Sequence, residues 1–147
     1  MKEILLLKLH DWIDKQIYTA KQAMDAAQES ATSDGKSSAG DKFETGRAMG
    51  HRDRDMFANQ LSAALKEKES LHKIDLKIVS PSVCFGSLVE TTAGIFFISI
   101  SMGKIKVEDK IIFAVSPQAP VCKDLIGKVK NDSFLFQGIK YEVIFIY

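Results

Sequence analysis

The chain has 147 residues, enough for one compact domain or two small units, and a hydrophobic content of 46% with 27% charged residues excludes a disordered chain. Its formal net charge of +1 excludes a strong general attraction to nucleic acid or to a membrane surface. Two cysteines, Cys84 and Cys122, are too few for a disulfide scaffold, and neither lies in a CxxC pair that would indicate zinc. We therefore expect two buried thiols in a reduced, cytoplasmic protein.

The N-terminal segment shows no targeting signal. Residues 4–7 form a short apolar run, but Lys8, His10 and Asp11 follow at once without a small-residue cleavage site, which argues against a signal peptide. No stretch approaches the ~20 apolar residues that a membrane-spanning helix needs. We expect no association with a membrane.

Residues 2–30 have the periodicity of one long helix. Their apolar residues recur at alternating spacings of four and three, which is the heptad pattern of a coiled-coil seam. The seam consists of Ile13, Ile17, Ala20, Met24, Ala27 and Ala31. No glycine or proline interrupts it, and Gly35 is a plausible end point because glycine readily adopts the left-handed conformation that ends helices.

Residues 41–73 predict a second helix on the same kind of pattern. Its heptad positions are Phe43, Phe57, Leu61, Ala64 and Leu71. The two helices should form an antiparallel coiled-coil hairpin, each about 40 Å long at a rise of ~1.5 Å per residue. Nearer residue 43 the same frame meets polar residues and glycine, so we expect looser packing toward the tip.

The tip of the predicted hairpin, residues 31–44, is small, polar and acidic. Its carboxylates are Asp34, Asp41 and Glu44, of which the last two share a helix face because they are three residues apart. A solvated tip contributes little to the stability of the fold. These carboxylates are therefore candidates for a function performed away from the body of the protein.

Each of these acids also has a structural interpretation. Asp34 before Gly35 is a common turn residue. Asp41 three residues after Ser38 resembles a capping box, and its charge complements the helix dipole. Glu44 could form an ordinary ion pair with a neighbouring basic residue. The spacing alone leaves both interpretations open.

After Asp75 the sequence changes to β-branched residues, glycine and period-two alternation. It predicts strands at 86–90, 95–100, 110–115, 134–137 and 141–146, and one short helix at 120–127. The predicted fold class is α+β. Residues 1–75 would form the coiled-coil hairpin, and residues 76–147 a small antiparallel β domain with one short helix.

Two stretches of the second half resemble a known family. Residues 119–128 read APVCKDLIGK, with Asn131-Asp132 after them, and residues 85–89 read FGSLV. They are similar to the C-terminal domain of the Gre-type transcript-cleavage factors of bacterial RNA polymerase, where the first stretch reads like SPIARALIGK followed by GD. In the hairpin, Phe43 and Arg47 fit that family's aromatic and basic positions after the tip. The resemblance covers nearly the whole chain and implies an FKBP-like fold for the β domain.

The resemblance implies a specific partner and mechanism. The β domain would dock at the rim of the secondary channel of bacterial RNA polymerase, with Pro120, Val121 and Lys123 as contacts. The hairpin would pass down the channel as a monomeric accessory factor, not an enzyme in its own right. It would bring Asp34, Asp41 and Glu44 to the polymerase active site beside the RNA 3′ end. There Asp41 and Glu44 would share a Mg²⁺ with the polymerase and help a water attack the backtracked RNA.

The tip departs from the family pattern. That pattern, GDLxENAEY, has an acid three residues after its Asp, whereas the residue three after Asp34 is Ser37. The longer tip leaves open a channel-binding regulator or inhibitor that does not stimulate cleavage. An FKBP-like prolyl isomerase or chaperone is a further alternative, with a pocket built from Phe85, Phe96, Phe97, Phe113 and Phe134.

Overall fold

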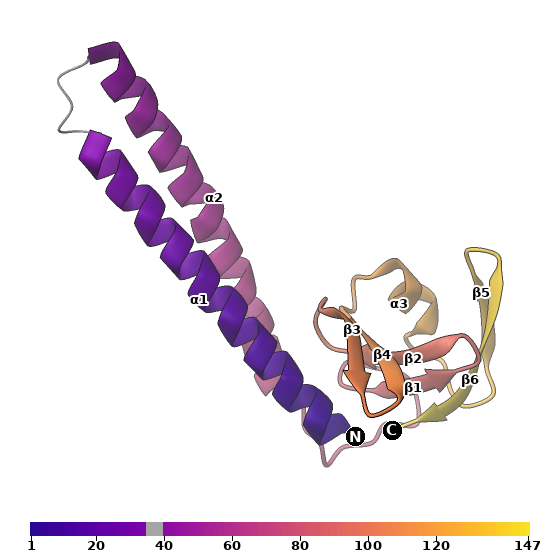
Figure 1. Ribbon diagram of the computed structural model, residues 1–147. Coiled ribbons are helices and arrows are strands. Elements are labelled where there is room, and N and C mark those ends of the chain that lie inside the picture. The colour runs from indigo at the N-terminus through magenta and orange to yellow at the C-terminus, as the bar shows by residue number, and fades with distance from the viewer. Residues whose placement is uncertain (35–39) are drawn as a thin grey trace. The chain divides into compact units, whose positions relative to one another are not determined.

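The structure is a computed structural model that describes the backbone of residues 1–34 and 40–147 and the side chains of residues 1–29 and 51–147. Two long helices, α1 (Lys2–Asp34) and α2 (Gly40–His72), are followed by a six-stranded sheet (Figure 1). This confirms the predicted α+β class. Within the described residues, no helix combines the length and apolar character needed to cross a bilayer.

By spatial contact the chain divides into two compact units. One comprises Asp11–Lys68, the greater part of both helices, and the other comprises Met1–His10 and Glu69–Tyr147. The first residues of α1, up to His10, and the last residues of α2, from Glu69, therefore belong to the same unit as the sheet. The sequence analysis placed the division near residue 75, where helical periodicity ends. Periodicity reflects local secondary structure, so it does not indicate which residues lie close together in space.

Within the Asp11–Lys68 unit, α1 and α2 lie side by side and run in opposite directions (Figure 1). Lys68 Nζ lies 2.7 Å from Asp14 Oδ1, and Arg54 Nη1 donates to Gln28 Oε1 at 3.0 Å. Gln28 is 14 residues after Asp14, and its partner Arg54 is 14 residues before Lys68. The two contacts therefore share one antiparallel register. In the other unit, the rings of His10 and His72 lie 4.8 Å apart at the same offset.

The predicted apolar stripes lie on the inner faces of these helices. Buried members are Ile13, Ala20, Ala64 and Leu71, and Leu9 is buried as well. Half-buried members are Ile17, Met24, Ala27, Phe57 and Leu61. Since most helix stability in proteins comes from packing an apolar face, these residues explain why α1 and α2 form together.

The sheet has the strand order β3-β4-β2-β1-β6-β5. The strands are β1 (Leu88–Thr91), β2 (Gly94–Ile98), β3 (Gly103–Val107), β4 (Lys110–Val115), β5 (Ser133–Phe136) and β6 (Ile139–Ile146), and α3 (Pro120–Leu125) lies between β4 and β5. All neighbouring strands are antiparallel except β2 and β4, which are parallel. The prediction of an entirely antiparallel sheet was therefore wrong at this pair.

The parallel pair arises from a strand that the sequence analysis missed. After β2 the chain forms β3 at the edge of the sheet. It then turns through Glu108 and Asp109 and continues as β4, antiparallel to β3. β4 inserts between β2 and β3, so it must run parallel to β2. The alternation of Lys104 to Val107 was a readable signal, since Ile105 and Val107 are both buried.

Both faces of the sheet are covered. One face packs against α3 in a cluster of Val83, Val89, Phe96, Ile98, Val121, Cys122, Leu125, Val143 and Ile146. The strand register places Leu88, Phe97 and Ala114 side by side on the opposite face, where all three are buried. β2 is therefore one of the two central strands of the sheet, with buried side chains on both of its faces.

Candidate functional site

The three acids of the predicted tip lie at the ends of the two helices. Asp34 is the last residue of α1, and Asp41 and Glu44 lie in the first two turns of α2. Their side chains lie outside the described residues, so their roles as catalytic carboxylates and metal ligands remain predictions.

The backbone register places these acids along the axis of the pair. Continuing the offset that joins Asp14 to Lys68 brings Asp34 level with Ala48. By this register residues 40–47 of α2 extend past the end of α1, and eight residues at ~1.5 Å each span about 12 Å. Figure 1 likewise shows α2 reaching beyond the end of α1. Asp41 and Glu44 lie on this extension, whereas Asp34 lies at its base.

The predicted partner contacts lie on and around α3, and they differ in exposure. Pro120, at the first turn as expected, and Lys123 are exposed, whereas Val121 is only 8% exposed and packs in the core. A direct contact at Val121, as the resemblance implied, requires an exposed side chain, and Val121 is buried. Its contribution to a partner surface would be to hold α3 in place beneath Pro120 and Lys123.

Backbone hydrogen bonds fix the end of α3 to the segment that precedes β1. Gly127 N donates to Val83 O at 2.9 Å, and Val83 N donates to Lys128 O at 2.8 Å. Gly127 has a φ of +88°, a conformation that glycine adopts without strain. Val89, in the 85–89 stretch, packs in the same core cluster as Val121 and Leu125 of the 119–128 stretch, so the two stretches are neighbours in the fold.

Two exposed apolar residues beside α3 were not predicted. Ile126 is 40% exposed and Val129 is 42% exposed, next to the exposed Lys130. Together with Pro120 and Lys123 they form the α3 surface. Ile126 follows the buried Leu125 directly at the end of α3.

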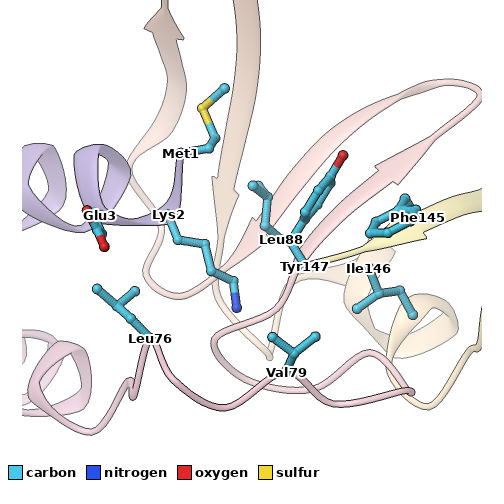
Figure 2. A pocket seen from close by; sticks show the side chains of 9 residues that line it. All are labelled: Met1, Lys2, Glu3, Leu76, Val79, Leu88, Phe145, Ile146 and Tyr147. Carbon is cyan, nitrogen blue, oxygen red and sulfur yellow. The ribbon is translucent and has the colours of Figure 1, made fainter.

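The sequence analysis also did not predict a cavity near the start of α1. A cavity of about 450 Å³ is lined by Met1, Lys2, Glu3, Leu76, Val79, Leu88, Phe145, Ile146 and Tyr147 (Figure 2). The apolar run 144–147 was its signal, because a period-two strand can bury only half of such a run. Phe145 and Tyr147 remain 42% and 43% exposed, with ring centroids 4.6 Å apart.

The rings considered for a prolyl isomerase pocket are mostly structural. Phe96 and Phe97 are buried on opposite faces of β2, and Phe96 packs 5.7 Å from Phe113 between ring centroids. Phe134 stacks on Tyr141 at 5.1 Å. These side chains fill the core around the sheet, and none of the five lines the 450 Å³ cavity.

The two cysteines have different environments. Cys122 is buried, and burial raises the pKa of its thiol to about 11, whereas Cys84 is exposed. The expectation of two buried thiols was therefore wrong for Cys84, which lies in an irregular turn before β1. Its neighbour Val83 takes the buried position in the core.

This difference predicts the order of alkylation. At pH 8 iodoacetamide should modify Cys84 rapidly and Cys122 at least about a hundredfold more slowly, because only thiolates react and Cys122 is both buried and almost fully protonated. Mass spectrometry of timed samples measures both rates in one protein. Comparable rates in the folded chain would contradict the placement of Cys122.

Among the side chains that the structure describes, no three or more His, Cys, Asp or Glu residues gather where they could hold a metal ion. Comparisons with protein-family models, with curated proteins and with solved structures find no match to this chain. The functional argument therefore rests on the residues and on the geometry described above.

Proposed function

We propose that the chain is a transcription elongation factor that binds bacterial RNA polymerase through its secondary channel and stimulates cleavage of backtracked RNA. Its two helices form a coiled-coil hairpin, and its sheet and α3 form an FKBP-like domain. The factor has no cleavage activity alone. It supplies carboxylates to the Mg²⁺ site of the polymerase.

The observation that carries the proposal is the register of the helix pair. Because residues 40–47 extend past α1, Asp41 and Glu44 lie at the most distal part of α2, where they can enter a site closed to the rest of the chain. Two carboxylates three residues apart on one helix can supply only part of the coordination shell of a divalent ion. The remaining ligands of such an ion would have to come from the carboxylates of a partner protein.

A second support comes from α3. The hydrogen bonds that Val83 accepts from Gly127 N and donates to Lys128 O, together with the burial of Val121 and Leu125, hold α3 against the sheet. Pro120 and Lys123 are thereby exposed on a preorganised surface. A preorganised, partly apolar surface that carries the cations Lys123 and Lys130 suits docking to a protein rim.

The direct test uses stalled, backtracked elongation complexes of the cognate polymerase with Mg²⁺, with and without the protein. Short RNA 3′ fragments that appear only with the protein would support the proposal. Binding without cleavage would replace it by the second candidate, a channel-binding regulator or inhibitor, which the longer tip favours. Absence of binding would overturn both.

The α3 surface gives a prediction about docking. Lys123→Glu should weaken binding to the polymerase by about tenfold or more, because it reverses the charge beside Pro120 while leaving the buried side of α3 intact. Fluorescence anisotropy of the labelled protein would measure the dissociation constant.

A matched control for that prediction is Lys140→Glu, which reverses an exposed charge on β6. The control should bind as tightly as the parent protein. Equal losses for both variants would indicate general charge attraction and would contradict docking through α3.

A further inference from the structure

The cavity of about 450 Å³ has a largely apolar wall and one cationic side chain. Its wall comes from four segments: the start of α1, the chain between α2 and β1, the start of β1, and the end of β6 with the residue after it. Leu76, Val79, Leu88, Phe145 and Ile146 supply hydrophobic surface, and Tyr147 supplies a ring. Cavities of roughly 300–1,000 Å³ with mostly apolar walls and a few polar groups are typical of sites for small molecules.

The cation is Lys2. Figure 2 shows its side chain extending from the start of α1 into the space among Leu76, Val79 and Leu88, with the ammonium group at its end. Burial lowers the pKa of Lys2 from its ordinary value, while Cys84 has the smaller, opposite effect. A charge held beside apolar side chains loses hydration that a bound anion could replace.

The acidic groups near Lys2 leave its charge uncompensated. Glu3 also lines the cavity, but its carboxylate lies apart from the Lys2 ammonium in Figure 2. Asp75 shares with Lys2 a smaller neighbouring cavity of about 110 Å³, and its Oδ1 already accepts a hydrogen bond from Lys77 N at 2.9 Å. Lys2 forms no ion pair within the described part of the chain.

We propose that this cavity binds a small amphipathic anion, with its apolar body against Leu76, Val79 and Phe145 and its anionic head on the Lys2 ammonium. The class comprises medium-chain carboxylates and similar monoanions with a flexible apolar body. A neutral amphiphile of the same length would bind more weakly because it leaves Lys2 without a counter-charge. The site is separate from α3 and from the ends of the helices that the proposed function uses.

The probe is decanoate below its micelle-forming concentration, with decanol as the neutral analogue. Nuclear magnetic resonance would follow methyl signals of Leu76, Val79 and Leu88 together with the Lys2 side-chain signal. We expect decanoate to bind about tenfold more tightly than decanol, in line with a charge-assisted contact. Bound decanoate should also raise the pKa of Lys2 toward its ordinary value.

Three variants make the test specific. Lys2→Met keeps an apolar side chain but removes the charge, and it should abolish the preference for decanoate over decanol. Val79→Trp should weaken both ligands by filling the cavity, since Val79 is 63% exposed and tolerates a larger side chain. Lys77→Met, which removes an exposed charge outside the lining, should leave both affinities unchanged.

Three outcomes would overturn the proposal. The first is equal affinity of the parent protein for decanoate and decanol, and the second is an unchanged preference in Lys2→Met. The third is binding only to vesicles of anionic phospholipid and not to monomeric decanoate, which would assign the contact to a lipid surface. None of these measurements requires RNA polymerase, so they fail or succeed independently of the proposed function.

Discussion

Replacing Asp34, Asp41 and Glu44 together with alanine is expected to lower stimulated RNA cleavage by about a hundredfold or more while leaving polymerase binding nearly unchanged. The reason is that the triple variant removes the ligands that this chain would supply to the Mg²⁺ shared with the polymerase. The polymerase alone would then retain only its intrinsic cleavage. Fragment yield from backtracked complexes, measured at saturating factor, reports the loss.

A matched variant separates this effect from a general loss of negative charge. Asp25, Glu29 and Asp53 are exposed acids on the same two helices, and along each helix they lie nearer the Asp14–Lys68 ion pair than the tip acids do. Replacing these three with alanine removes the same charge and should leave cleavage near the parent level. If the triple variant at residues 34, 41 and 44 also fails to bind, those acids have a docking role and the assigned chemistry is wrong.

The single variants have a predicted order. Because residues 40–47 extend past α1, Asp41→Ala and Glu44→Ala should each reduce cleavage more than Asp34→Ala. The same cleavage assay measures all three. A larger effect at Asp34 would show that the helix register changes before the tip.

The second large effect is expected in the sheet. Phe97→Ala should destabilise the protein by about 3–5 kcal/mol, because Phe97 is fully buried on β2, one of the two central strands, and its removal leaves a cavity. That loss is comparable with the ~5–15 kcal/mol total stability of typical proteins. Urea unfolding followed by circular dichroism, with amide exchange of β2, would measure it.

Leu135→Ala is the appropriate control for Phe97→Ala. Leu135 lies on the edge strand β5 and is 71% exposed, so its truncation should change stability by less than about 0.5 kcal/mol. Similar losses for both variants would contradict the placement of β2 at the centre of the sheet.

The local elements were predictable because they depend on nearest-neighbour patterns. The heptad spacing of Ile13 and Ala20 predicted α1, and the stripe that includes Ala64 and Leu71 predicted α2; all four side chains are buried. Pro120 and Gly127 bounded the short helix α3 to within two residues. In each case the chain's own periodicity or backbone restriction was sufficient.

The candidate sites were predictable only in part. The acids of the tip and Lys123 were visible as charged residues in suitable segments, but Val121, expected as a contact beside Lys123, is buried. The cavity around Lys2 was not predicted, because its wall joins residues from both ends of the chain. No local pattern links Lys2 to Tyr147.

By itself, the sequence determined that this protein has two long helices followed by short strands, since periodicities of 3.6 and two residues are properties of local backbone geometry. Only the tertiary structure decided that β4 inserts between β2 and β3, which makes one strand pair parallel. It likewise decided that Val121 faces the core and that Lys2 faces a cavity. These outcomes depend on which distant segments compete for the same apolar surface, and that competition is settled by packing of the whole chain.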